Sequence, residues 1–375
     1  MRHLHSLAGL CLGIFMLLTV GVFTARADDS AADAPTIVKD RVLVSAFTVN
    51  SYKGDYKVFS WLPQISFRVN GPIASGSQLW AEFKLPTGPF VKFDCKTEET
   101  EKGHWWNVEN AGGRDAGEDK GITYTGPVDF AIHVRNELAG TDSVLFSGKF
   151  KVNKVHSNET GPDYVNHMVY YVDQDWNLPI GYVFLTPDDV REMKLPGFNA
   201  AFWVRGEAVE FQPHLFYQGK EVGKITLDGE EIGKAGGEAE LGVETTQYVD
   251  ETQLPEKARW SRVICSFPNI KAWNETGETF SGIPGQKGSM FFMKDNPGEY
   301  EVKVLRKGKL ARSLKFTVKP DGSFDDSITT ANKMGDKRAI VPVKIIGDQD
   351  GKWDKDAWKT DAFYGNPLTG FTAVE

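Results

Sequence analysis

Apolar and polar side chains alternate along two short segments of the chain, residues 128–134 and 300–304. A second alternating segment follows each of them, at residues 150–152 and 314–318. Successive side chains of a β-strand point to opposite faces, so this period places one set in a core and the other in water. The pattern predicts two half-buried antiparallel hairpins.

The two hairpin segments belong to a longer internal repeat. A shift of 170 residues aligns Cys95 with Cys265, inside predicted strands at residues 90–96 and 260–267. A repeat of this length indicates duplicated domains, because the units of solenoid proteins span only ~20–45 residues.

Residues 297–318, PGEYEVKVLRKGKLARSLKFTV, resemble the last two strands of immunoglobulin-like and fibronectin-type sandwiches in exported bacterial proteins. The resemblance implies a sandwich fold and implies no function, since this architecture carries many activities. We therefore predict an all-β protein of two tandem immunoglobulin-like β-sandwiches, with one short helix at residues 186–194 and a C-terminal extension.

Composition marks the predicted domain boundaries. The polar run at residues 156–162 ends in Gly-Pro and separates the two domains. Residues 228–256 hold nine acids against one base, Lys234, which predicts an acidic insertion, either a long exposed loop or a loop that binds a partner. The predicted organisation is a signal peptide at 1–27, a first sandwich at 40–155, a second sandwich at 163–320, and an extension at 321–375 packed on the second sandwich.

The first 27 residues have the pattern of a signal peptide. A basic start at Arg2 precedes an apolar run over residues 7–23 and a small-residue ending, Ala25-Arg26-Ala27. The alternative is an uncleaved membrane anchor, which this run only just reaches because spanning helices use ~17–25 residues. We expect an extracytoplasmic protein, periplasmic or secreted, with no stable membrane insertion after cleavage.

Charge argues against a nucleic-acid partner. The chain carries 43 Lys and Arg against 51 Asp and Glu, a net charge of −8, and loss of residues 1–27 removes two bases and no acid, which leaves −10. An acidic chain without a basic block repels phosphate backbones.

Only Cys95 and Cys265 remain after the predicted leader. Their alignment in the repeat places them in different domains, whereas a disulfide needs α-carbons within ~7 Å. We predict two buried free thiols. The alternative is one disulfide, the usual outcome in an oxidising compartment.

No catalytic residue, cofactor or metal site is predicted. The chain lacks G-x-S-x-G, H-E-x-x-H and C-x-x-C, and His133 lies in the outward register of its strand. Residues 348–356, DQDGKWDKD, suggest calcium. Aligning Gly351 with the glycine of an EF-hand loop, however, puts Ile346 and Ala357 at the first and last ligand positions. A solvated acidic turn is expected there.

Tryptophan supplies the candidate ligand-binding residues, Trp105 and Trp106, because flat exposed aromatic rings can stack on sugar faces. Adjacent strand residues point to opposite faces, so one ring of this pair is expected to face the core. Trp80 and Trp203 are expected to fill sandwich interiors.

The leading hypothesis for function is a noncatalytic extracytoplasmic binding or structural module that contacts a protein or a cell-surface component. It follows from the predicted tandem sandwiches and from the lack of a catalytic motif. The alternatives are a carbohydrate-binding protein that uses an exposed tryptophan, and a hydrolase without a recognisable motif.

Overall fold

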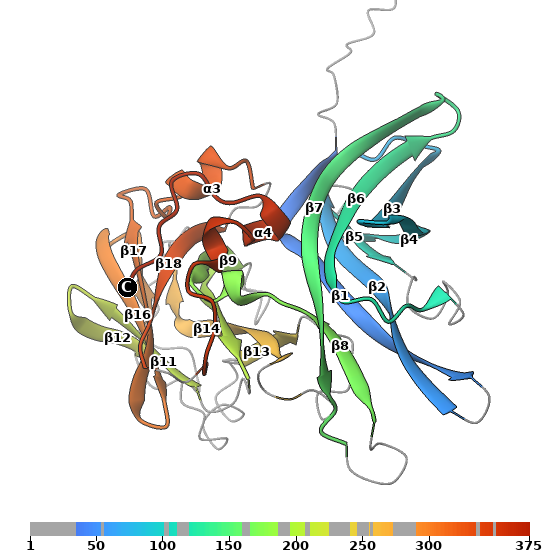
Figure 1. The fold of residues 1–375 in the computed structure, drawn as a ribbon. Helices are drawn as coiled ribbons and strands as arrows, with labels where there is room; N and C mark the ends of the chain where they lie inside the picture. Colours follow the sequence, from blue (N-terminus) through green and yellow to red (C-terminus); the bar gives the residue numbers. More distant parts are fainter. Residues whose placement is uncertain are drawn as a thin grey trace, which may run out of the picture.

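The computed structural model describes residues 35–53, 56–100, 105–110, 120–159, 166–186, 196–206, 211–224, 241–245, 255, 258–272, 290–334, 338–347 and 350–375. In these residues the protein is all-β, as predicted, with two large sheets and only short helices. The two sheets form the two halves of the molecule, and helix α4 (Ala362–Gly365) lies between them (Figure 1). The predicted signal peptide lies outside the described residues, as does the predicted helix apart from Thr186.

The first sheet contains β1 (Thr36–Lys53), β2 (Tyr56–Asn70), β3 (Ser77–Leu85), β4 (Gly88–Thr100), β5 (Trp105–Asn110), β6 (Gly126–Asn136), β7 (Thr141–His156) and β8 (Met168–Val172). Their spatial order is β1-β2-β5-β4-β3-β6-β7-β8. Strand β4 changes neighbours along its length, because residues 88–94 pair with β3 and residues 95–100 pair with β5. A strand shared in this way lets one sheet bend into two layers.

The outer strands of this bent sheet approach each other. The backbone N–H of Tyr170 in β8 donates a hydrogen bond to Oγ1 of Thr48 in β1, at 3.1 Å. Strand β8 pairs with β7, so it belongs to the first sheet although it follows the predicted boundary at residues 156–162.

The second sheet contains β9 (Ile180–Thr186), β10 (Gly197–Arg205), β11 (Phe211–Tyr217), β12 (Lys220–Lys224), β13 (Leu241–Thr245), β14 (Trp260–Lys271), β15 (Phe291–Phe292), β16 (Gly298–Arg306), β17 (Lys309–Val318) and β18 (Ala339–Ile345). Its main order is β12-β11-β16-β17-β18-β9-β10-β14-β13, and β15 pairs with β14. Strand β18 joins two layers, since residues 339–342 pair with β9 and residues 343–345 pair with β17.

Two of these strands come from segments to which the sequence assigned other roles. Strand β18 lies in the predicted C-terminal extension, yet it is the central link of the second sheet. Strand β13 lies in the predicted acidic insertion and pairs with β14, whereas most other residues of that insertion lie outside the described ranges.

Both predicted hairpins are confirmed. In the β6–β7 hairpin, Phe130 and Ile132 are buried and Asp129 is exposed, and in the β16–β17 hairpin Tyr300 and Val302 are buried. The period of two therefore located the core face of each strand correctly.

The cysteine prediction is confirmed as well, although the repeat that supported it does not extend to the cysteines. Cys95 in β4 and Cys265 in β14 are both buried and free. The repeat aligns β6 with β16, but one strand separates β4 from β6, whereas four strands separate β14 from β16. The two thiols thus occupy different places in their sheets, and the immunoglobulin-like character of each half stays a prediction.

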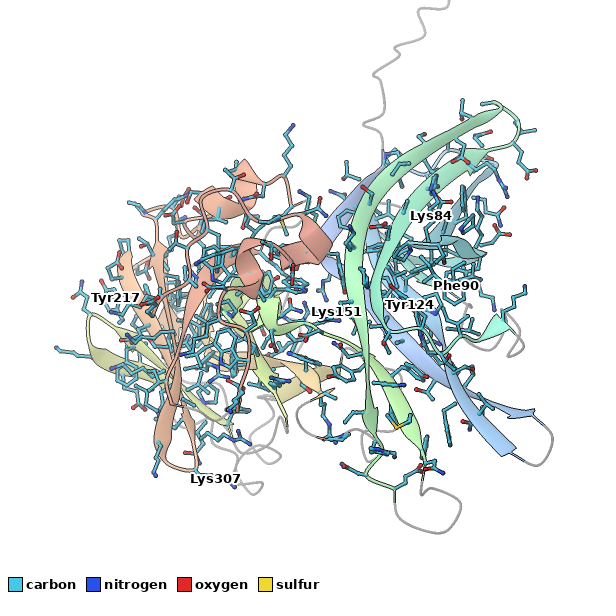
Figure 2. All side chains as sticks on the ribbon, in the orientation of Figure 1. Lys84, Phe90, Tyr124, Lys151, Tyr217 and Lys307 are labelled. Atoms are coloured by element: carbon cyan, nitrogen blue, oxygen red, sulfur yellow. The ribbon has the colours of Figure 1, made fainter. Side chains whose placement is uncertain are left out.

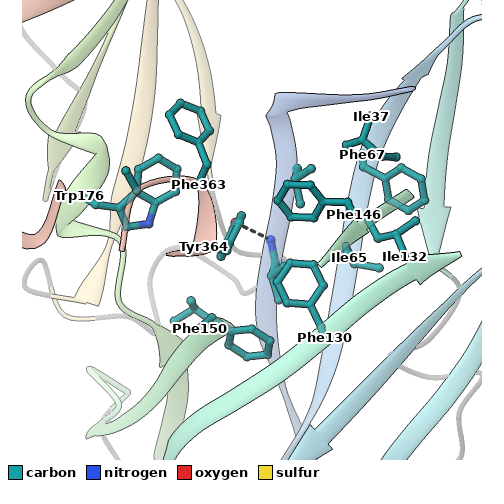
Figure 3. Close-up of a cluster of buried hydrophobic side chains, with 14 of the residues drawn as sticks. Ile37, Ile65, Phe67, Phe130, Ile132, Phe146, Phe150, Trp176, Phe363 and Tyr364 are labelled. Carbon is teal, nitrogen blue, oxygen red and sulfur yellow. Dashed lines mark hydrogen bonds between the residues drawn. The ribbon is translucent and has the colours of Figure 1, made fainter. Parts of the chain in front are cut away.

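The first hydrophobic core is shared between both halves. Inward side chains of the first sheet, such as Phe130 and Phe150, contact a cluster that includes Tyr182 from β9 and Phe363 and Tyr364 from α4 (Figure 3). A second core fills the space between the layers of the second sheet. Side chains occupy the interior of both halves (Figure 2).

Helix α4 contains two successive bulky residues with unusual backbone angles. Phe363 and Tyr364 have φ angles of 47° and 61°, a left-handed conformation that costs about 1–3 kcal/mol in a bulky residue. Packing holds them there: both are buried, and the Tyr364 hydroxyl accepts a hydrogen bond from the backbone N–H of Val44 at 2.8 Å (Figure 3). Gly148 of β7 makes room, since a Cβ at that position would lie 2.8 Å from Tyr364 Cβ.

A buried ion pair also joins the two halves. Arg338, just before β18, places its guanidinium 3.2 Å from the carboxylate of Asp40 in β1, and both side chains are less than a tenth exposed. Because a buried charge is costly without its partner, this pair fixes how the first strand meets the C-terminal segment.

Candidate functional site

A groove of about 680 Å³ lies beside β18, in the second half of the molecule. The C-terminal segment forms most of its wall. The lining residues are Pro179, Val343, Ile345, Gly347, Trp353, Lys355, Asp356, Trp358, Lys359, Thr372, Ala373, Val374 and Glu375. The volume falls within the ~300–1,000 Å³ that ligand pockets usually have.

Two indole rings, those of Trp353 and Trp358, give the groove its apolar surface. Both side chains are partly exposed, and each packs against other side chains of the protein. Trp353 packs against a small cluster of buried side chains that includes Trp203 and Trp260. Trp358 meets Phe371 edge-on, with ring centroids 5.4 Å apart. The rings are therefore fixed in place while part of each remains accessible.

Charges of both signs surround these rings. Lys359 lies 2.5 Å from the carboxylate of Asp356 and 5.7 Å from the centre of the Trp358 ring. Lys355 and Glu375 are exposed and add one further charge of each sign. The side chains that line the groove thus carry no net charge.

A network of buried polar groups anchors the segment that carries both indoles. The Asp350 carboxylate accepts a hydrogen bond from the backbone N–H of Arg205 at 2.9 Å and pairs with the guanidinium of Arg312, which is almost completely buried. The guanidinium of Arg205 in turn donates to the backbone oxygen of Lys352. The start of this segment is consequently fastened to β10 and β17.

Asp175 forms the second anchor. It lies in the short 3-10 turn η3 (Asp175–Asn177), and its carboxylate accepts hydrogen bonds from the backbone N–H of Asp354 at 2.8 Å and from Trp260 Nε1–H at 3.1 Å. The guanidinium of Arg205 is 3.7 Å away. Turn η3 follows β8 of the first sheet, so Asp175 connects both halves to the wall of the groove.

Burial raises the pKa of the Asp175 carboxyl to about 6, and the nearby Asp173 carboxylate adds to the rise. The hydrogen bond from the Asp354 backbone N–H, the Arg205 charge and the Trp260 N–H oppose it. Burial likewise raises the pKa of the neighbouring Tyr171 hydroxyl. Desolvation therefore outweighs the favourable partners of this carboxylate.

In the described part of the acidic turn, residues 350–356, aspartates take part in structural contacts, and Asp350 is buried, so the expectation of a solvated turn is wrong for this residue. Asp350 contacts Arg205 and Arg312. The backbone N–H of Asp354 donates to Asp175, and the carboxylate of Asp356 pairs with Lys359. Among the residues that the structure describes, no group of three His, Cys, Asp or Glu side chains is arranged to hold a metal ion.

The predicted ligand-binding residues, Trp105 and Trp106, lie in β5, away from the groove in the fold. Trp105 is paired with Asn70 and Thr100, and Trp106 with Val69 and Glu99. Their side chains are outside the described part of the structure, so their role stays a prediction.

Two further expectations concern side chains on the outer face of the first sheet. His133 points outward as predicted, and its ring stacks on Trp80 with centroids 3.9 Å apart. Its Nδ1 is 3.2 Å from Asp142, and its Nε2 is 3.5 Å from Glu82, which also pairs with Lys84 (labelled in Figure 2). The expectation that Trp80 fills an interior is therefore wrong. Its neighbours in β3, Leu79 and Ala81, occupy the core face, which leaves Trp80 on the other.

Trp203 is buried, as expected, but its contacts lie between the halves. Even-numbered residues of β10 such as Phe202 enter the second core, whereas Trp203 joins Trp260 and Leu178 on the opposite face. This small cluster supports Trp353 of the groove. The sequence predicted only an extension packed on the second sandwich at residues 321–375, and no pattern in it marked Trp353 or Trp358 as part of a binding site.

No known protein family matches the chain, and no curated protein is similar to it. Among solved structures, the chain is similar to one described as the BSP domain of a biofilm associated protein, with 9% sequence identity over 84% of this chain. It spans 65% of the length of that chain, and the TM-score is 0.14. A similarity this weak carries no argument about fold or function. No helix among the described residues is long and apolar enough to cross a membrane.

Proposed function

We propose that this chain is a noncatalytic extracytoplasmic module that binds a cell-surface component in the groove beside β18. The observation that carries the proposal is the pair of partly exposed indoles, each rigidly supported from behind and surrounded by charged groups. Concave sites with apolar walls and a few convergent polar groups are the usual form of a ligand site.

The composition of the groove supports binding without catalysis. Its lining contains no histidine, cysteine or serine, and the carboxylate of Asp356 is engaged by Lys359. A serine or cysteine nucleophile with an adjacent histidine base therefore has no counterpart among these lining residues. The extracytoplasmic part of the proposal rests on the signal-peptide pattern of residues 1–27.

The test uses the full chain, expressed with its own N-terminal segment and with an affinity tag inserted after Asp29. Wild-type protein and the groove variant Lys355→Glu are incubated with envelope extract, and the retained protein and polysaccharide are identified. Lys355 has no hydrogen bond or ion pair to any described residue, so its substitution leaves the fold intact. We expect a component that the wild type retains and the variant loses. Equal retention by both proteins contradicts a role for the groove.

A further inference from the structure

We propose that the groove is a saccharide site, which takes a neutral oligosaccharide against the rings of Trp353 and Trp358. This inference rests on the proposed function and names the chemical class of its ligand. Three features of the groove support it: the rings, the hydrogen-bonding groups beside them, and the balance of charge.

The rings supply flat apolar surfaces that are already ordered. Trp353 is held by the Trp203 and Trp260 cluster, and Trp358 is held by Phe371, so little conformational entropy is lost when a ligand stacks on them. Sugar rings present faces of C–H groups that match such surfaces. Aromatic side chains bury a large area for the few torsions they immobilise.

Polar groups next to the rings match hydroxyl groups, which both donate and accept hydrogen bonds. The indole N–H groups of Trp353 and Trp358, and the ammonium of Lys355, have no hydrogen-bond partner among the residues that the structure describes. They are donors available to a ligand. The carboxylates of Asp356 and Glu375 are acceptors on the same groove.

Charge balance selects a neutral ligand over a charged one. An anionic ligand would meet the carboxylates of Asp356 and Glu375, and a cationic ligand would meet Lys355 and Lys359. The cation–π position at Trp358 is already occupied, since Lys359 lies 5.7 Å from the ring centre. A neutral polyhydroxylated ligand avoids both repulsions and can hydrogen-bond with Lys355 and Glu375, while Asp356 and Lys359 are paired with each other.

The experiment titrates the purified full chain with maltotriose, cellotriose, mannotriose and chitotriose, with trigalacturonate as the anionic probe and tetramethylammonium as the cationic probe. Isothermal calorimetry gives the affinity. A ligand-induced change in indole fluorescence is assigned to the groove only if Trp358→Ala reduces it, because the chain has ten tryptophans. We expect at least one neutral trisaccharide to bind and to be recovered intact. Trp358→Ala should weaken it by about tenfold or more, and Trp358→Phe by less, because the ring remains while the N–H is lost.

Two further variants keep the test decisive if Trp358→Ala unfolds. Lys355→Met alters an exposed side chain without a protein partner and should weaken binding severalfold. Trp80→Ala is the matched control, because this indole is also partly exposed but lies on the first sheet, and it should leave the affinity unchanged.

The saccharide assignment is overturned if no neutral trisaccharide binds, if only a charged probe binds, or if the Trp358 and Lys355 variants bind as the wild type does. Groove-dependent retention from envelope extract together with a failed sugar panel leaves the proposed function standing and removes this inference alone. Cleavage of a bound trisaccharide contradicts the noncatalytic function instead.

Discussion

The buried carboxylate of Asp175 should make the stability of this protein depend on pH in a way that one substitution removes. The Asp175 carboxylate accepts hydrogen bonds from the backbone N–H of Asp354 and from the Trp260 indole N–H. The charged or titratable groups around it are Tyr171 and Asp173, which precede it in the chain, and Arg205 from β10. The perturbation is Asp175→Asn, which removes the titration while keeping the size of the side chain.

The sign and size follow from the pKa. Because the pKa of Asp175 is about 6 in the folded chain against an ordinary value of 3.8, the folded state binds the proton more tightly than the unfolded state does. The free energy of unfolding therefore falls as pH rises from about 3.8 to about 6, and stays lower above that. The loss is at most about 3 kcal/mol at pH 7.5 and about 0.5 kcal/mol at pH 4.

The assay is urea unfolding of wild type and variant at pH 7.5, 6, 5 and 4. The variant loses one acceptor, so the two proteins differ in stability by an amount that does not depend on pH. In addition to this constant difference, the free energy of unfolding of wild type should rise by about 2 kcal/mol relative to that of the variant when the pH is lowered from 7.5 to 4. Asp173→Asn should shrink this gain without removing it, because Asp173 is the second cause of the raised pKa. A difference in stability between wild type and Asp175→Asn that stays constant over this range would show that folding does not raise the pKa of Asp175.

Three further predictions test the packing. Gly148→Ala should lower the free energy of unfolding by about 1–3 kcal/mol in urea, since its Cβ would lie 2.7 Å from the Phe130 ring, and Ser147→Ala next to it should change little. Arg338→Ala should cost about 3–5 kcal/mol by the same assay because it leaves Asp40 buried without its ion pair, whereas Lys149→Ala, which breaks an exposed pair, should cost under about 1 kcal/mol. Thiol titration without reductant, on protein from which residues 1–27 have been removed, should find no reactive thiol in the native state and two after denaturation. Burial raises the pKa of Cys95 to about 12 and that of Cys265 further, and no thiol in either state would mean a disulfide.

The alternation of apolar and polar residues predicted those features that depend only on neighbouring residues, namely the strands and their buried faces. The alternation in residues 128–134 and 300–304 needs only the period of a strand, and it located the buried faces of β6 and β16. The same period left His133 on the outer face. The all-β fold class could be predicted from such segments because the alternation within each segment shows that it is a strand with one buried face.

The folding of each sheet into layers was not predictable in this way. Strand β18 lies in the segment predicted as an extension, and its position between β17 and β9 depends on pairings that its own residues do not encode. The repeat suggested equivalent places for Cys95 and Cys265, and the strand order contradicts this. An alignment with few identities cannot distinguish similar strands at different positions of a sheet.

The groove was not predicted from the sequence for a related reason, namely that contacts distant in the sequence shape the segment that forms its wall. Trp353 and Trp358 carry no periodic signal, because the segment between β18 and α4 takes its shape from distant partners: Asp175, Arg205 and Arg312 lie between 38 and 179 residues away in hydrogen bonds to it. The chain then continues into α4, where the Tyr364 hydroxyl accepts a hydrogen bond from the backbone N–H of Val44 in the first sheet, 320 residues away in the sequence. One stretch of chain thus completes the core between the halves and forms the wall of the groove. The contacts that order the indoles are the contacts that join the sheets, so the groove is as rigid as the junction on which it is built.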